Sequence, residues 1–253
     1  MAGIRQGKVA LVTGGGSGIG RATSLRLAKE GAKIMIGDYV PEGAERTVKM
    51  IKEAGGEASC MSADVSFAKQ VEAMINKTIE TYGRIDCAFN NAGIEGKFSD
   101  TILCTEDNFD RTIAIDLKSV WLCMKYEIPQ MLKQGGGSIV NTASIAGLVG
   151  FNGIPAYVAA KHGVVGLTRT AALEFAQKNI RVNCVCPGVI RTPMVERAID
   201  GGGFTEAEVT AAEPIGRLGK PEEIAEGVLW LLSDASSFVT GHPLTIDGGW
   251  VAH

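Results

Sequence analysis

Short apolar runs recur along the chain, separated by longer segments with helical spacing. A strand with one face in water alternates apolar and polar residues, whereas a parallel strand covered on both faces is apolar almost throughout. The runs are too continuously apolar for the first kind, so they predict buried parallel strands. They cover residues 8–14, 32–38, 57–64, 85–93, 137–144, 180–188 and 243–249.

The segments between the runs place apolar residues at helical spacing among Glu and Lys. The clearest predicted helices cover 41–56, 66–83 and 220–234. Pro41 and Pro221 stand where a first helical turn tolerates a missing N–H. Because strands and helices alternate, the connections are expected to be right-handed crossovers. The pattern therefore predicts an α/β fold with a doubly wound parallel sheet.

One irregular segment interrupts this alternation. No repeat, low-complexity tract or linker divides the chain, so a single domain over residues 1–253 is expected. Residues 188–221 form a long, partly apolar stretch with three glycines at 201–203. Such a stretch between a strand and the next helix is typical of a lid or substrate loop, expected here over about 188–218.

Composition and charge exclude several classes of protein. The formal net charge is −3 and no cluster of Lys or Arg stands out, which argues against a nucleic-acid partner. The six cysteines form no C-x-x-C pattern and are expected to be reduced. No signal-peptide pattern and no apolar run of the ~18 residues that a membrane span needs is present. We expect a cytoplasmic protein without membrane association, and the three histidines have no metal-ligand spacing.

A glycine-rich loop, TGGGSGIG at 13–20, directly follows the first predicted strand and opens a helix. Gly14, Gly18 and Gly20 lack the Cβ that would keep the backbone away from a pyrophosphate. The start of the helix offers free N–H groups and a positive dipole end to the phosphates. The spacing differs from the common G-x-G-x-x-G, so the position between strand and helix is what indicates a dinucleotide site.

Polar residues at the ends of the next strands extend this site. Asp38 ends the second predicted strand, and a carboxylate there accepts both hydroxyls of an adenosine ribose and repels a 2′-phosphate. No Arg or Lys directly follows it, so NAD is favoured over NADP, although Asp38 alone is also an ordinary turn residue. Asp64 and Val65 are expected to frame the adenine. The NNAG motif at 90–93 ends the fourth strand, where such sheets bind ligands.

Tyr157 and Lys161 lie four residues apart, on the same face of a predicted helix. Alone, the pair is more typical of packing at the edge of a core than of chemistry. A free Tyr, with a pKa of about 10, is a poor base near neutral pH, but an adjacent ammonium and a positive nicotinamide both favour the phenolate. The hydroxyl of Ser144, at the end of the fifth strand, can donate to a carbonyl oxygen as charge grows there.

Taken together, these motifs resemble the short-chain dehydrogenase/reductase family. The resemblance runs from about residue 5 to the C-terminus and is carried by TGGGSGIG (13–20), NNAG (90–93), Ser144, YVAAK (157–161) and PGVIRT (187–192). It implies a seven-stranded Rossmann sheet in the order 3-2-1-4-5-6-7 and NAD(P)-dependent alcohol–carbonyl interconversion. It also implies a homotetramer, or a dimer, built partly on the helices around 101–134 and 156–177.

The resemblance further implies a role for each site residue. Tyr157 would be the acid/base, Lys161 its partner and Ser144 the residue that holds the substrate oxygen, while Ile190 and Thr192 would hold the nicotinamide amide. The expected cofactor-binding residues are Thr13, Gly14, Ser17, Gly18, Ile19, Gly20, Asp38, Asp64, Val65, Asn91, Ala92, Gly93, Tyr157, Lys161, Pro187, Gly188, Ile190, Thr192 and Met194.

One position departs from the family pattern, because Asp116 stands where the family usually carries a catalytic Asn. That Asn is thought to hold, largely through its backbone carbonyl, a water that links the Lys to solvent. An Asp keeps the carbonyl and adds a negative charge near Lys161 unless it stays neutral. We expect a modest effect, with catalysis retained.

The expected substrate wall is largely apolar. Its expected substrate contacts are Ser144, Ala146, Phe151, Asn152, Tyr157 and Met194, with Leu148, Ile154 and the loop near Phe204 as further wall. This favours a fairly apolar secondary alcohol or ketone over an anionic one, and resemblance in NTASIAGLVG (141–150) points to relatives acting on cyclic diols. Arg191 and Arg197 are exceptions unless they face water.

Three alternative functions remain open. A 3-oxoacyl-type ketoreductase is disfavoured by Asp38, because such enzymes normally use NADPH. A reductase of C=C bonds is disfavoured because related enoyl reductases usually space Tyr and Lys more widely. A non-catalytic NAD-binding scaffold is disfavoured by the presence of both Tyr157 and Lys161.

Overall fold

The computed structural model describes residues 6–201 and 205–252. Within them, seven parallel strands form one sheet in the order β3-β2-β1-β4-β5-β6-β7, which confirms the predicted topology. Each strand lies inside its predicted run. The strands are β1 (Val9–Thr13), β2 (Lys33–Asp38), β3 (Glu57–Ser62), β4 (Cys87–Asn90), β5 (Gly137–Thr142), β6 (Ile180–Pro187) and β7 (Pro243–Ile246).

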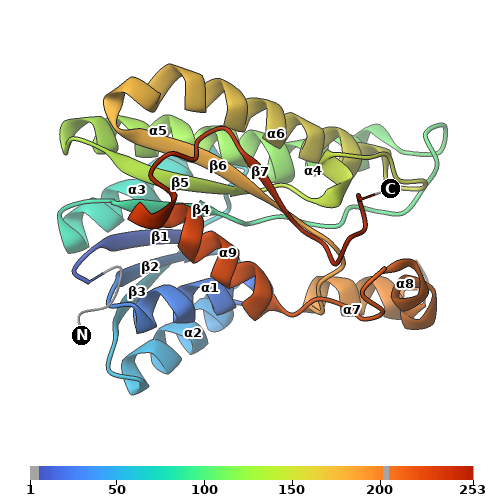
Figure 1. The fold of residues 1–253 in the computed structure, drawn as a ribbon, viewed down its shortest axis with the longest axis horizontal. Coiled ribbons are helices and arrows are strands. Elements are labelled where there is room, and N and C mark those ends of the chain that lie inside the picture. Colours follow the sequence, from blue (N-terminus) through green and yellow to red (C-terminus); the bar gives the residue numbers. More distant parts are fainter. Residues whose placement is uncertain (1–5, 202–204, 253) are drawn as a thin grey trace.

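Helices connect the strands and cover both faces of the sheet (Figure 1). The predicted helices at 41–56, 66–83 and 220–234 are confirmed as α2, α3 and α9, and α2 and α9 begin at the predicted prolines. The helices are α1 (Gly18–Lys29), α2 (Pro41–Glu53), α3 (Ala68–Tyr82), α4 (Glu106–Ile113), α5 (Ser119–Lys133), α6 (Pro155–Phe175), α7 (Pro193–Asp200), α8 (Glu206–Ala212) and α9 (Pro221–Leu232).

The strands are apolar throughout because each of their faces meets a different core. Leu11 and Met35 pack in the core beneath α3, α5 and α6. Their neighbours Val12 and Ile36 pack in the opposite core with α1, α2 and α9. All four side chains are fully buried. The period-2 alternation of a strand therefore assigns side chains to two helical layers rather than to a core and solvent.

The strand order reverses beside β1, which pairs with β2 on one side and β4 on the other. Chains that leave these neighbouring strands cross to opposite faces, so a crevice opens beyond their carboxyl ends. The residues that the predicted runs extend beyond the strands, such as 91–93 and 143–144, are the turns at this edge. The fold therefore gathers the predicted motifs at one place.

Helices α7 and α8 extend beyond the carboxyl edge of the sheet (Figure 1). They belong to the predicted lid over 188–218, and that role stays a prediction. An ion pair between Arg197 of α7 and Glu95 (3.3 Å) joins this segment to the loop after β4, and Arg191 pairs with Glu206 of α8. Phe204, expected near the substrate, lies outside the described residues.

All six cysteines lie in the described part of the chain, and none of them forms a disulfide. Cys184 and Cys186 are both buried in the same core, as alternation along β6 predicts. No helix among the described residues is long and apolar enough to cross a membrane.

Candidate active site

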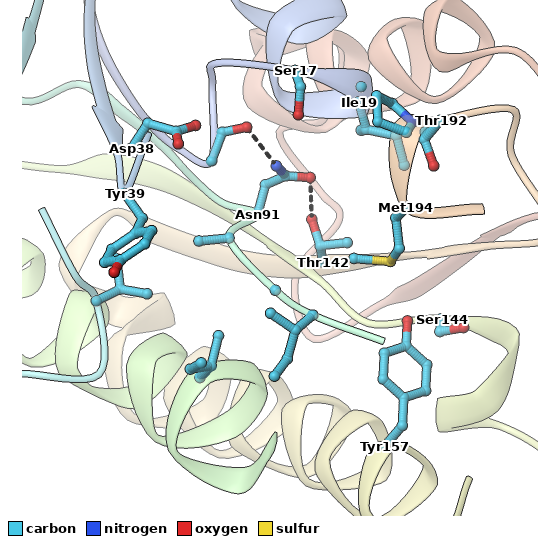
Figure 2. A pocket seen from close by; sticks show the side chains of 18 of the residues that line it. Ser17, Ile19, Asp38, Tyr39, Asn91, Thr142, Ser144, Tyr157, Thr192 and Met194 are labelled. Carbon is cyan, nitrogen blue, oxygen red and sulfur yellow. Dashed lines mark hydrogen bonds between the residues drawn. The ribbon is translucent and has the colours of Figure 1, made fainter. Parts of the chain in front are cut away.

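A cavity of about 710 Å³ lies at the carboxyl edge of the sheet (Figure 2). It is lined by the glycine-rich loop, the ends of β2 and β4, the Tyr–Lys pair of α6 and the segment after β6. Every predicted cofactor-binding residue lines this cavity except two. The exceptions are Thr13 and Gly20.

Thr13 and Gly20 shape the cavity from behind. The buried Thr13 hydroxyl accepts hydrogen bonds from the backbone N–H groups of Asn91 (2.9 Å) and Ala92 (3.1 Å), which joins the ends of β1 and β4. A Cβ on Gly20 would lie 2.1 Å from the carbonyl oxygen of Gly14. These residues therefore fix the path of the loop rather than its inner surface.

The glycine-rich loop has the geometry that a pyrophosphate needs. Gly14 and Gly18 have positive φ values of 64° and 48°, which L side chains rarely adopt. A Cβ on Gly18 would approach the Thr192 side chain to 3.2 Å. Helix α1 begins directly after Ser17, so its first N–H groups and positive dipole end meet the cavity. The loop therefore fits a dinucleotide.

The Asp38 carboxylate is held at the other end of the cavity by backbone donors. The Gly16 N–H donates to Oδ2 (2.8 Å) and the Val40 N–H donates to Oδ1 (2.8 Å). Both oxygens keep further lone pairs for ribose hydroxyls. Tyr39, which is 73% exposed, also lines this end, although the sequence reasoning did not assign it a role. Its position directly after the strand-end carboxylate was the available signal.

Ser144, Tyr157 and Lys161 come together at the cavity wall. Lys161 is only 3% exposed, its Nζ donates to the carbonyl oxygen of Thr142 (3.1 Å), and it lies 5.3 Å from the centre of the Tyr157 ring. Ser144 caps a short 3-10 helix, where its Oγ accepts from the Ala146 N–H (3.1 Å). The Tyr157 hydroxyl points toward Ser144 (Figure 2).

The surroundings of Tyr157 raise its pKa above the ordinary value, chiefly because burial disfavours the phenolate. Lys161 and the Ser144 hydroxyl act in the lowering direction, and the carboxylates of Asp116 and Glu95 in the raising direction. Lys161 therefore lowers the pKa of Tyr157 and so favours the phenolate. The rise in that pKa caused by burial is larger.

Asp116 lies behind this cluster. It sits in a single π-helical turn, Ala114–Lys118, between α4 and α5, and its side chain is fully buried. Oδ1 accepts a hydrogen bond from the Ile94 N–H (2.8 Å), while Oδ2 has no partner. Burial raises the pKa of Asp116 to about 6, and the nearby Lys161 limits the rise. A Cβ on Gly93 would meet both Asp116 Oδ1 and Lys161 Nζ, at 2.9 and 3.5 Å.

The predicted substrate wall is only partly at the cavity. Met194 lines it together with Ser144 and Tyr157, whereas the other wall residues do not. Ala146 is buried in the core, and the Phe151 ring packs on Trp250 at a centroid distance of 5.8 Å. The remaining wall residues outside the lining are Leu148, Asn152 and Ile154.

Several lining residues were not predicted from the sequence. One group lies at or just after strand ends, which was a usable signal: Gly37, Tyr39, Val40, Ala63, Ser66, Ile94, Thr142 and Ala143. The other group lies on helices without any motif to mark it: Arg111, Ala114, Ile115, Pro193, Val195 and Arg197. Among the described residues, no three His, Cys, Asp or Glu side chains gather as a metal site requires.

Comparison with known proteins agrees with this geometry. The family model described as "Enoyl-(Acyl carrier protein) reductase" matches residues 14–251. Cyclohexanol dehydrogenase of Acinetobacter sp. (strain SE19) is 46% identical over 245 residues, which cover 97% of this chain and 95% of that protein. The crystal structure of a levodione reductase matches with a TM-score of 0.95 at 44% identity, over 98% of both chains.

A second solved structure, an NAD⁺-bound xylitol dehydrogenase, matches with a TM-score of 0.93 at 37% identity, over 97% of this chain and 99% of that one. These relatives share the whole fold, and the motifs for cofactor and proton transfer lie together in one cavity of this chain. The chain therefore belongs to the short-chain dehydrogenase/reductase family, whose members use NAD(P), and is an oxidoreductase acting on CH–OH groups.

Proposed function

We propose that the protein is an NAD-dependent oxidoreductase that interconverts cyclic secondary alcohols and ketones. The observation that carries the proposal is that Asp38 lines one end of a cavity that Ser144, Tyr157 and Lys161 line at the other (Figure 2). One end meets an adenosine ribose, and the other meets a reacting hydroxyl or carbonyl.

The chain supplies the proton transfer and the positioning. When bound, NAD⁺ supplies the hydride acceptor. Tyr157 Oη takes the proton of the substrate hydroxyl during oxidation and returns it during reduction. The Ser144 hydroxyl donates to the substrate oxygen, where charge develops. Lys161, held by the Thr142 carbonyl, keeps a positive charge beside the Tyr157 ring and so stabilises the phenolate.

The preference for NAD follows from the charges around Asp38. Its carboxylate would repel a 2′-phosphate. The Arg21 guanidinium interacts with the Asp38 charge, but it donates to the Gly16 carbonyl and to the Thr47 hydroxyl (3.0 Å) and does not line the cavity. A 2′-phosphate in the cavity would therefore meet the Asp38 carboxylate, while this guanidinium stays outside the lining.

The proposed substrate class has two supports. Apolar side chains make up much of the cavity lining near the site, among them Ile94, Ile115, Met194 and Val195. Relatives of similar length carry the names cyclohexanol dehydrogenase and levodione reductase. A 3-oxoacyl reductase is the alternative, because a protein of that name from Thermotoga maritima is 43% identical over 250 residues.

We also propose that the protein assembles as a homotetramer, with a dimer as the smaller alternative, through the layer of α4, α5 and α6. This layer leaves apolar side chains in water. Phe109 is 40%, Trp121 44% and Leu173 85% exposed. Contact with a second copy would bury them.

A substrate panel tests the proposed function. Cyclohexanol, a linear secondary alcohol and a sugar alcohol are offered with NAD⁺ or NADP⁺, and cyclohexanone and a 3-oxoacyl thioester with the reduced cofactors, following absorbance of the reduced nicotinamide. We expect the highest kcat/KM for the cyclic pair with NAD. Preference for the thioester with NADPH would instead establish the ketoreductase alternative.

A further inference from the structure

The buried Asp116 differs from the other polar groups at the site because one of its oxygens has no partner. Its side chain is fully enclosed, Oδ1 accepts from the Ile94 N–H, and Oδ2 accepts from no group in the described part of the chain. A buried carboxylate without full hydrogen bonding is costly when ionised. Burial therefore raises the pKa of this carboxyl, to about 6.

Among the described residues, the cation that acts on this carboxyl is Lys161, which also acts on Tyr157. Lys161 lowers the pKa of Asp116 and also that of Tyr157. Asp116 Oδ1 and Lys161 Nζ crowd the same face of Gly93. One buried ammonium thus lies between an acid and a phenol, and an ionised Asp116 offsets the charge that would otherwise stabilise the phenolate.

We propose that Asp116 is a titratable positioning residue that controls, through Lys161, the pH at which Tyr157 releases its proton. With Asp116 neutral, the full charge of Lys161 acts on the phenol. With Asp116 ionised, the acid and the ammonium offset each other and Tyr157 keeps its proton to higher pH. The inference rests on the proposed role of Tyr157 as the acid/base.

Other charged groups around Asp116 are few. Glu95, in the loop after β4, acts on both Asp116 and Tyr157 in the raising direction, and it forms an ion pair with Arg197. Lys118 shares the π-helical turn and is exposed. From α6, Lys161 and Tyr157 are the groups that act on the site.

The test is Asp116→Asn, because an amide of the same shape keeps an oxygen for the Ile94 N–H and removes the charge. Oxidation of an alcohol that the protein turns over needs the phenolate. The acidic limb of the pH–rate profile for oxidation is therefore expected to move to lower pH. Reduction of the ketone needs the phenol, so its basic limb is expected to move the same way. We expect both shifts to be about one pH unit. The two proteins should converge below about pH 6, where Asp116 of wild type is neutral like the amide of the variant.

A second readout does not depend on turnover. The tyrosinate absorbance of the protein is titrated, and the curve of Tyr157→Phe is subtracted to isolate Tyr157. The same subtraction is made in the Asp116→Asn background. We expect the Tyr157 midpoint to lie at lower pH when Asp116 is replaced.

The matched control is Glu127→Gln. Glu127 is the other fully buried carboxyl with an unpartnered oxygen, but it contacts Asn90 in the core and does not act on Tyr157. Its replacement is expected to leave the acidic limb of oxidation and the basic limb of reduction at the same pH as in wild type.

Two results would overturn the inference and leave the proposed function standing. One is unchanged limbs and an unchanged Tyr157 midpoint in Asp116→Asn. The other is a lower rate at every pH without a shift, which is the result of a merely structural role. Near-wild-type activity of Tyr157→Phe would instead refute the proposed function itself.

Discussion

At the scale of single residues, burial decides what the motif residues can do. Lys161 and Asp116 have the side chains of surface residues, yet both lie almost wholly out of water. The motif predicted that a Tyr and a Lys would meet. It did not predict that burial would raise the pKa of Tyr157, or that Asp116 Oδ2 would lack a partner, because both depend on how distant segments enclose the residues.

Asp38 offers a prediction at this scale. Asp38→Asn removes the charge that repels a 2′-phosphate, and it leaves only one oxygen for the N–H groups of Gly16 and Val40. The ratio of kcat/KM for NADP⁺ to that for NAD⁺ is expected to rise about tenfold, or ~1.4 kcal/mol. Steady-state kinetics with both cofactors measure this ratio.

The control for this variant is Glu42→Gln, which neutralises an exposed carboxylate in the first turn of the neighbouring α2. It is expected to leave the ratio unchanged. An unaltered ratio in Asp38→Asn would mean that Asp38 does not select the cofactor.

At the scale of elements, the strands and helices could be predicted closely from the sequence, whereas the residues of the cavity wall could not. Strands buried on both faces leave a strong signal in the sequence. The strand-end motifs directly follow these strands, so their positions could be predicted too. Phe151 and Ile115 show the limit: the first packs on Trp250 from the C-terminal segment and the second lines the cavity from a π-helical turn. Neither arrangement has a local sequence pattern.

Helix α5 carries a pH-dependent cost. Burial raises the pKa of Glu127 from its ordinary value of 4.5 to about 7. Because the pKa of Glu127 is higher in the folded state, this carboxyl ionises first in the unfolded chain. The free energy of unfolding therefore falls as pH rises from about 4.5 to about 7. The free energy of unfolding of Glu127→Gln, relative to that of wild type, is therefore expected to rise by about 2 to 3 kcal/mol between pH 5 and pH 8.

Denaturant unfolding of both proteins at the two pH values measures this difference. Other buried acids, such as Asp116, titrate in both proteins, so their contributions cancel in the difference between wild type and variant. A difference that stays constant with pH would show that Glu127 is not held neutral by the fold.

At the scale of the whole molecule, the sheet, two helical layers and the cavity were predictable, since five motifs occur in order along one chain. Assembly was implied only by the family resemblance. The exposed apolar side chains of α5 and α6 give that expectation a physical basis.

Leu173→Glu tests the assembly. A carboxylate placed at this 85% exposed position would be buried unpaired in an interface, so the dissociation constant of the oligomer is expected to rise at least about tenfold. Sedimentation velocity across protein concentrations measures it. Met50→Ser, on the opposite layer, is the control, and identical sedimentation of wild type and Leu173→Glu would exclude this face.

The central claim is that Tyr157 transfers the proton in an NAD-dependent reaction of a cyclic alcohol or ketone. The most direct measurement is kcat for cyclohexanol oxidation with NAD⁺ in wild type and in Tyr157→Phe, together with NAD⁺ binding to both proteins. The account predicts a loss of about 10²- to 10⁴-fold in kcat, with binding of NAD⁺ changed only slightly. A Tyr157→Phe protein that oxidises cyclohexanol at a near-wild-type rate would contradict it.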